Sequence, residues 1–174
     1  DAADINEDSE GTSGILSPRE ILIKRLLLAH ETWYDVTRDF TVCGRTFAGL
    51  AAFHSYGEQY VLVKRAKLWE TETHEHILFE NVPHLTQDIF TETIGFLKEH
   101  VLPELIHPAP DQMSSDLSVI IVADSMQEGL DRVIRKTRYR KDFMFGLKGW
   151  CDLRVVVVDL SGSFGKHVYT NAAG

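Results

Sequence analysis

The chain has 174 residues, of which 44% are hydrophobic and 25% are charged, and its formal net charge at pH 7 is −8. This is the composition of one soluble globular domain, and the apolar runs are far shorter than the roughly 18 residues that a membrane span requires. Two cysteines, Cys43 and Cys151, are too few for a disulfide-rich secreted scaffold or a four-cysteine zinc site. We therefore expect a cytoplasmic protein with free thiols.

The start of the chain differs from the rest in composition. Residues 1–14 contain five acids and no bases, so they bury too little apolar surface to offset the entropy lost on ordering. We expect a flexible acidic segment there and a single globular domain over residues 15–174. Ser17-Pro18-Arg19-Glu20 forms a capping box with proline at the first helical position, which predicts a helix that runs to about Tyr34.

The hydrophobic pattern then changes to that of strands. It predicts three of them, at residues 47–56, 59–70 and 75–81, with Gly57-Glu58 as the first turn. Connections this short imply an antiparallel meander. In the second strand Lys64 lies on the side expected to face the core, where it would pair with a buried acid such as Glu80 or mark a polar pocket.

A helix and a βαβ unit follow the meander. Thr86 is expected to cap a helix that Pro103 kinks or ends. Residues 118–123 and 152–160 form apolar strands, Ser125-Met126-Gln127-Glu128 is a second capping box between them, and a last strand is expected near residues 167–170. The predicted fold is α+β, in which an antiparallel three-strand meander and a C-terminal βαβ unit form one mixed sheet with the helices packed mainly on one face.

The order of elements, helix, three-strand meander, helix and strand, resembles the core of restriction-endonuclease-like nucleases. That family carries a D/E-x-K signature on a strand, and no lysine here has an acid two residues before it. The resemblance therefore extends to element order only. Residues 60–69 (YVLVKRAKLW) and 145–150 (FGLKGW) are similar to segments of an uncharacterised bacterial domain family, a domain of unknown function. This second resemblance covers most of the chain after Tyr34 and implies no activity.

Three polar residues stand at the ends of the two predicted parallel strands. Asp124 and Ser125 follow the first strand, and Asp159 lies near the end of the second. Open α/β sheets bind ligands at this edge, where the two acids could hold Mg²⁺ or Ser125 could contact an anion. In the simpler interpretation Ser125 caps the next helix, Asp124 favours the positive helix end and Asp159 begins a turn.

A basic face is expected on the helix between these strands and just beyond it. Aromatic residues are interleaved with it, so it would suit a phosphate backbone, or equally an acidic protein surface such as the chain's own acidic segment. A charge run of this kind is also typical of a solvated helix face. Its members are Arg132, Arg135, Lys136, Arg138, Arg140 and Lys141.

An alternating stretch of acids and histidines suggests a metal site. Glu70, Glu72, His74 and His76 would share one face of an unbroken strand, and such side chains can bind zinc or another divalent metal. A turn within the stretch would instead leave them as solvated hairpin residues.

The sequence contains no P-loop, dinucleotide-binding, metalloprotease or nucleophile-elbow motif, and it indicates no particular cofactor or catalytic residue. We predict a non-catalytic binding or regulatory module that acts through protein contacts, with another protein or as a homodimer. The alternatives are a nucleic-acid-binding protein that uses a basic helix over residues 132–141, and a metal-dependent hydrolase that uses Asp124 and Asp159 or the histidine pair. No membrane partner is expected.

Overall fold

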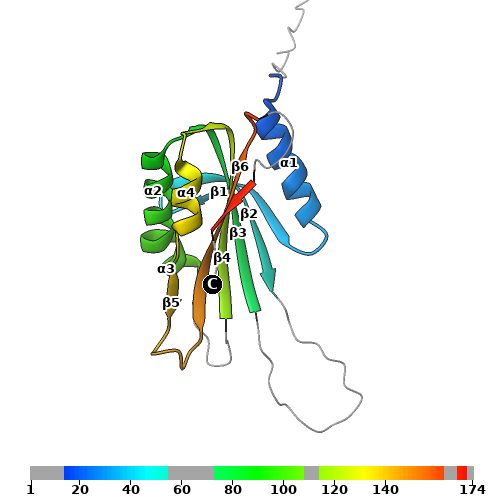
Figure 1. Cartoon of the computed structure of the whole chain (residues 1–174). Coiled ribbons are helices and arrows are strands. Elements are labelled where there is room, and N and C mark those ends of the chain that lie inside the picture. Colours follow the sequence, from blue (N-terminus) through cyan, green and yellow to red (C-terminus); the bar gives the residue numbers. More distant parts are fainter. Residues whose placement is uncertain (1–13, 55–72, 108–113, 163–167, 172–174) are drawn as a thin grey trace, which may run out of the picture.

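The computed structural model describes residues 14–54, 73–107, 114–162 and 168–171, so the predicted acidic segment lies outside it except for Gly14. One sheet contains seven strands in the order β1-β2-β3-β4-β6-β5, with β7 also paired to β6 (Figure 1). The strands are β1 (Asp35–Val42), β2 (Arg45–His54), β3 (Thr73–Leu85), β4 (Ser114–Met126), β5 (Arg140–Asp142), β6 (Trp150–Asp159) and β7 (Val168–Thr170). The helices are α1 (Pro18–His30), α2 (Gln87–Phe96), the π-helical turn η1 (Leu97–Val101), α3 (Leu102–Leu105) and α4 (Leu130–Lys136).

The sheet is mixed, which confirms the predicted α+β fold. β1, β2 and β3 pair antiparallel, whereas β3, β4 and β6 pair parallel. β5 and β7 both lie antiparallel to β6. The chain therefore combines an antiparallel meander with a β4–α4–β6 crossover unit, and β7 confirms the last predicted strand.

The described meander differs from the predicted one in its first strand. β2 and β3 correspond to the predicted strands at residues 47–56 and 75–81, and they pair directly with each other. The predicted strand at residues 59–70 lies outside the described residues. The sequence did not predict β1, because Val42 is the only residue of this edge strand that is buried.

Helices cover the two faces of the sheet unequally. α2, η1, α3 and α4 lie over one face and α1 lies over the other, which confirms that the helices pack mainly on one face (Figure 1). The larger core includes Leu78, Val119 and Val155 of the sheet beneath Phe90 and Ile134. No helix among the described residues is long and apolar enough to cross a membrane.

The predicted capping box of α1 is present. The N–H and Oγ of Ser17 donate to Oε2 of Glu20 at 2.7 and 2.8 Å. The helix ends at His30, earlier than predicted, because the N–H groups of Trp33 and Tyr34 both bond to the His30 carbonyl and turn the chain into β1.

The second long helical region changes its hydrogen-bond pattern ahead of Pro103. Thr86 caps α2 as predicted, with Ile89 N–H donating to its Oγ1 at 3.2 Å. In η1 the N–H of Leu102 donates to Leu97 O, five residues back. Proline has no N–H and its ring crowds the preceding helical turn, so a π-helical turn accommodates it. The helix consequently continues through Pro103 to Leu105.

The capping box predicted at Ser125 is wrong. Ser125 and Met126 belong to β4, where they pair with β3, and α4 begins at Leu130 after Gly129, which has φ of 80° and no side-chain cap. Pairing with a long neighbouring strand outweighs the local helix signal. The basic helix predicted over residues 132–141 is also too long, since α4 ends at Lys136 and Arg140 begins β5.

Candidate functional site

Asp124 lies at the edge where the parallel strands end, as predicted, but it is held by α1. Its carboxylate forms an ion pair with the Arg19 guanidinium. Arg19 Nε also donates to Oδ1 of Asn81 on β3 at 2.5 Å. Asp124 therefore links β4 to the first turn of α1.

Asp159 lies on the opposite face of the sheet from Asp124. Val157 packs in the larger core, whereas Val122 packs against α1. Side chains two residues apart along a strand share a face, so Asp159 and Asp124 turn away from each other. Asp159 accepts hydrogen bonds from the N–H and Oγ of Ser161 at 2.9 and 2.7 Å, which forms a turn. In the described residues, no group of three or more His, Cys, Asp or Glu could hold a metal ion.

Ser125 makes a contact that the sequence did not indicate. Its Oγ lies 2.7 Å from Nδ1 of His84, because the two residues face each other in the parallel register of β3 and β4. A serine beside a histidine meets one requirement of a nucleophilic centre, which also needs donors for an oxyanion. The N–H of Gln87 at the start of α2 is already bonded to Gln127 Oε1 at 2.9 Å. We interpret the pair as a link between strand ends.

The predicted basic face is split between two elements and partly neutralised. Arg135 pairs with Asp131 at 3.8 Å. Arg140 makes a bidentate pair with Asp152, with distances of 2.6 and 2.7 Å. Lys141 lies 5.7 Å from the centroid of the Phe143 ring. The other members are exposed, namely Arg132 and Lys136 on α4 and Arg138 after it.

The predicted metal site and polar pocket are only partly within the described residues. His76 is buried in β3, opposite Leu117 of β4. His74 is described by its backbone, which pairs with Ser115. Lys64, Glu70 and Glu72 lie outside the described residues. The metal site and the pocket therefore stay predictions.

A row of acids that the sequence did not predict crosses the sheet face on the α1 side. Its carboxylates face one another on β3, β4 and β6 and belong to Glu75, Asp116 and Asp152. Tyr34 donates to the first at 2.7 Å, Arg154 pairs with the second at 3.2 Å, and Arg140 pairs with the third. Burial raises the pKa of Asp116 against the pull of Arg154, and burial and the bond to Glu75 raise the pKa of Tyr34 to about 12. Each acid has its own partner, so the row ties strands together.

Exposed apolar side chains are concentrated in two places. Of the nine large apolar side chains that are exposed in the described residues, five lie between positions 15 and 33 and three lie in the loop between β5 and β6. Single exposed apolar residues are common, whereas clusters of them mark contact surfaces. The first group consists of Ile15, Leu16, Ile21, Leu28 and Trp33.

Comparison with known families adds a classification. The family model described as Domain of unknown function (DUF8052) matches residues 19–174. The chain belongs to this family. This confirms the resemblance to an uncharacterised domain family. The matched residues include the whole second apolar group and, of the first group, Ile21, Leu28 and Trp33. No curated protein and no solved structure matches the chain.

The second apolar group of this DUF8052 domain lies in the β5–β6 loop, residues 143–149. Met144, Phe145 and Leu147 are 58%, 103% and 84% exposed. Met144 and Phe145 both have left-handed backbone, with φ of 49° and 55°. The sequence predicts that the aromatic residues of this stretch belong to the basic face. The turn exposes them instead, and their spacing in the sequence does not reveal that turn.

Proposed function

We propose that this domain is a non-catalytic binding module that acts through protein contacts, with the outward side of α1 as its contact surface. The observation that carries the proposal is that α1 is apolar on two sides. Ile23 and Leu27 are buried against the sheet, yet Leu28 is 62% exposed and Trp33, just beyond the helix, is 74% exposed. Clusters of exposed apolar side chains mark contact surfaces, so the outward side of α1 is expected to be covered by a partner.

The outward side of α1 combines apolar and cationic positions. Ile21 and Leu28 are two helical turns apart and therefore lie on one side, with Lys24 and Arg25 between them. All four side chains are exposed. A partner that fits this surface carries carboxylates between apolar side chains.

These cations favour a different protein over a second copy of the chain at this surface. A two-fold axis across the outward side of α1 would bring Lys24 and Arg25 of two copies together, and like charges at an interface are destabilising. A homodimer through another surface stays a separate prediction, which native mass spectrometry of the purified chain addresses directly.

Site-specific photocrosslinking in cells of the organism that naturally makes the protein tests the proposal. p-Benzoylphenylalanine replaces Leu28 in one variant and Val168, which is 58% exposed on β7, in a matched control. We expect a discrete crosslinked protein from position 28 that is missing from position 168. Equal crosslinking from both positions would contradict a specific surface on α1.

A binding measurement with the captured protein completes the test. Leu28→Ser combined with Trp33→Ser is expected to raise Kd by at least about tenfold, because each fully buried apolar side chain contributes about 1.5–3 kcal/mol. Isothermal titration calorimetry measures Kd, and Val168→Ser should leave it unchanged. An unaltered Kd for the double variant would rule out the outward side of α1 as the contact surface.

The two alternative functions have less support in this arrangement. Arg135 and Arg140 are engaged by carboxylates, which weakens the case for phosphate binding. Asp124 and Asp159 lie on opposite faces, which weakens the case for a shared metal. Nucleic-acid binding and metal-dependent hydrolysis stay predictions from the sequence.

A further inference from the structure

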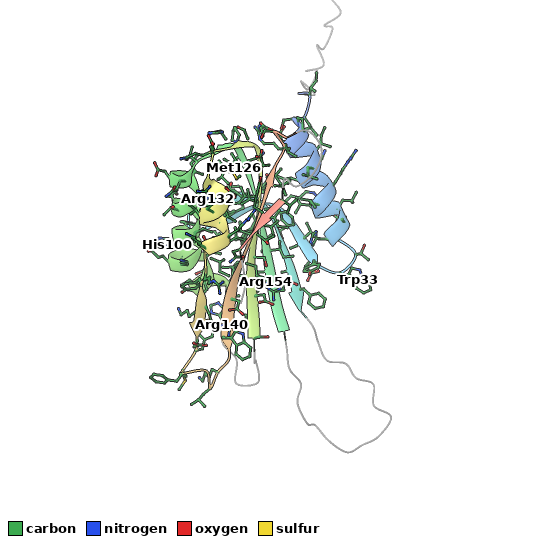
Figure 2. All side chains as sticks on the ribbon, in the orientation of Figure 1. Trp33, His100, Met126, Arg132, Arg140 and Arg154 are labelled. Atoms are coloured by element: carbon green, nitrogen blue, oxygen red, sulfur yellow. The ribbon has the colours of Figure 1, made fainter. Side chains whose placement is uncertain are left out.

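We infer that the β5–β6 loop, residues 143–149, docks on the surface of an anionic lipid bilayer by inserting its apolar side chains. The loop projects past the end of β5 (Figure 1). It is a different surface from that of α1, since Figure 2 shows Trp33 and Arg140 on opposite sides of the domain. The inference therefore stands independently of the proposed protein contact.

The size and shape of the loop favour a lipid surface over a protein. Phe145 and Leu147, in the middle of the loop sequence, are 103% and 84% exposed. A stable protein interface involves about 20–30 residues from each partner. Peripheral attachment to a bilayer can use a few apolar side chains together with charge attraction. Three apolar side chains on a projecting turn match the second requirement.

The backbone of the loop is prepared for a medium of low polarity. Five of its seven N–H groups donate to carbonyls within the loop, at 2.9–3.2 Å. Peptide groups without partners are costly to move out of water, so a loop that bonds its own backbone enters the interface at lower cost.

Two bulky residues of the loop have an unfavourable backbone conformation that side-chain packing does not offset. Bulky residues rarely adopt the positive φ seen at Met144 and Phe145. The Phe145 ring is fully exposed, so no packing among the described residues offsets its unfavourable φ. Strained, fixed conformations of this kind cluster at functional sites.

Charge around the loop complements an anionic surface. Of the four basic residues in the stretch 138–150, Arg140 is paired with Asp152, which leaves Arg138, Lys141 and Lys148 beside one acid, Asp142, in a chain whose net charge is −8. Lys148 is exposed within the loop, and basic residues next to a bilayer are attracted to anionic headgroups. Trp150, which begins β6 directly after the loop, adds an aromatic side chain of the kind that suits the headgroup region. The expectation of no membrane partner rested on the lack of a spanning segment, which a peripheral loop does not require.

Vesicle flotation with the whole chain tests the inference. The probes are phosphatidylcholine vesicles with and without one-third phosphatidylserine. We expect binding to the anionic vesicles, and a loss of at least about tenfold in partitioning for Phe145→Ser combined with Leu147→Ser. The matched control, Val168→Ser, removes an apolar side chain that is 58% exposed elsewhere and should bind like the wild type.

A depth measurement separates insertion from adsorption. Phe145→Trp should gain fluorescence quenching by brominated lipid beyond that of the native tryptophans. One outcome would overturn insertion in favour of adsorption by charge. In that outcome the variant with Lys141→Gln and Lys148→Gln no longer binds, whereas the double variant of Phe145 and Leu147 still binds. A wild-type chain that does not float with anionic vesicles would also overturn the inference and point to a protein pocket for the loop. Neither result bears on the protein contact proposed at α1, because the loop variants leave every residue of α1 unchanged.

Discussion

Asn171 is a single side chain that completes the outer edge of β6. β5 and β7 pair with separate parts of that edge and leave a gap between them. Oδ1 of Asn171 accepts from Val155 N–H at 2.8 Å, and its Nδ2 donates to the carbonyls of Leu153 at 2.9 Å and Thr137 at 3.2 Å. The buried amide thus takes the place of a missing stretch of strand.

Asn171→Ala is expected to lower the free energy of unfolding by about 2–4 kcal/mol, because three backbone groups lose their partner at a buried site. Urea unfolding followed by circular dichroism measures the change. Thr170→Ala, an exposed neighbour on β7, should stay within about 0.5 kcal/mol of the wild type. A loss below about 1 kcal/mol for Asn171→Ala would mean that water substitutes for the amide.

α1 approaches β2 so closely that position 49 has no room for a side chain. A Cβ at Gly49 would lie 2.6 Å from Cδ2 of Leu27 and 3.2 Å from the carbonyl oxygen of Thr37. Gly49→Ala is therefore expected to lower the free energy of unfolding by about 1–3 kcal/mol through overpacking. Urea unfolding measures it, and a Leu27→Ala background should reduce the penalty because the crowding side chain is gone.

The same substitution in α2 provides the control. A Cβ at Gly95 would meet nothing within 4 Å, and alanine is a better helix former than glycine. Gly95→Ala should therefore raise the free energy of unfolding by about 0.5–1 kcal/mol. Effects of the same sign at both positions would show that the close approach of α1 to β2 does not control stability.

Elements with a strong local signal could be predicted, and elements defined by distant partners could not. The Ser17 box and Thr86 mark helix starts correctly because each cap bonds within its own turn. Ser125 has the same local pattern but lies in β4, since pairing with β3 extends the strand beyond its apolar part. β1 and β5 were missed because edge strands need few buried residues and so leave little trace in the hydrophobic pattern.

The candidate surfaces were predictable to a smaller extent than the fold. The sequence drew attention to Asp124 and Asp159 through their place at strand ends, but alternation within the strands sends them to opposite faces. The partner of Ser125 is His84, 41 positions away, and no local pattern identifies it. The outward side of α1 is the exception, because Ile21 and Leu28 are two helical turns apart in the sequence and so share one side of a helix.

At the scale of the whole molecule, Arg45 joins the meander to the helical layer. Its guanidinium pairs with Glu80 of β3 at 3.0 Å and donates to Thr93 of α2 at 2.9 Å. It also lies over the rings of Phe47 and Phe96, 5.2 and 5.3 Å from their centroids. A charged cluster at the junction of β2, β3 and α2 makes the stability of the fold depend on the protonation of Glu80.

Burial raises the pKa of the Glu80 carboxyl above its ordinary value of 4.5, and the pull of Arg45 in the other direction does not cancel this. The folded chain therefore binds the proton more tightly than the unfolded chain does. The stability contributed by this carboxyl is complete below pH 4.5 and is lost as the pH rises through the folded pKa. Relative to the wild type, Glu80→Gln should gain stability as the pH rises through that window.

Urea midpoints measured across that pH range test this, and the slope of the difference is the quantity of interest, because the variant also loses its ion pair with Arg45. Gly95→Ala titrates nothing and should run parallel to the wild type. A difference that moves in favour of the wild type with rising pH would mean that Arg45 outweighs burial and lowers the Glu80 pKa. In that case the buried charges would stabilise the junction of β2, β3 and α2. The raised pKa of Glu80 predicts instead that its ionised carboxylate costs stability at this junction.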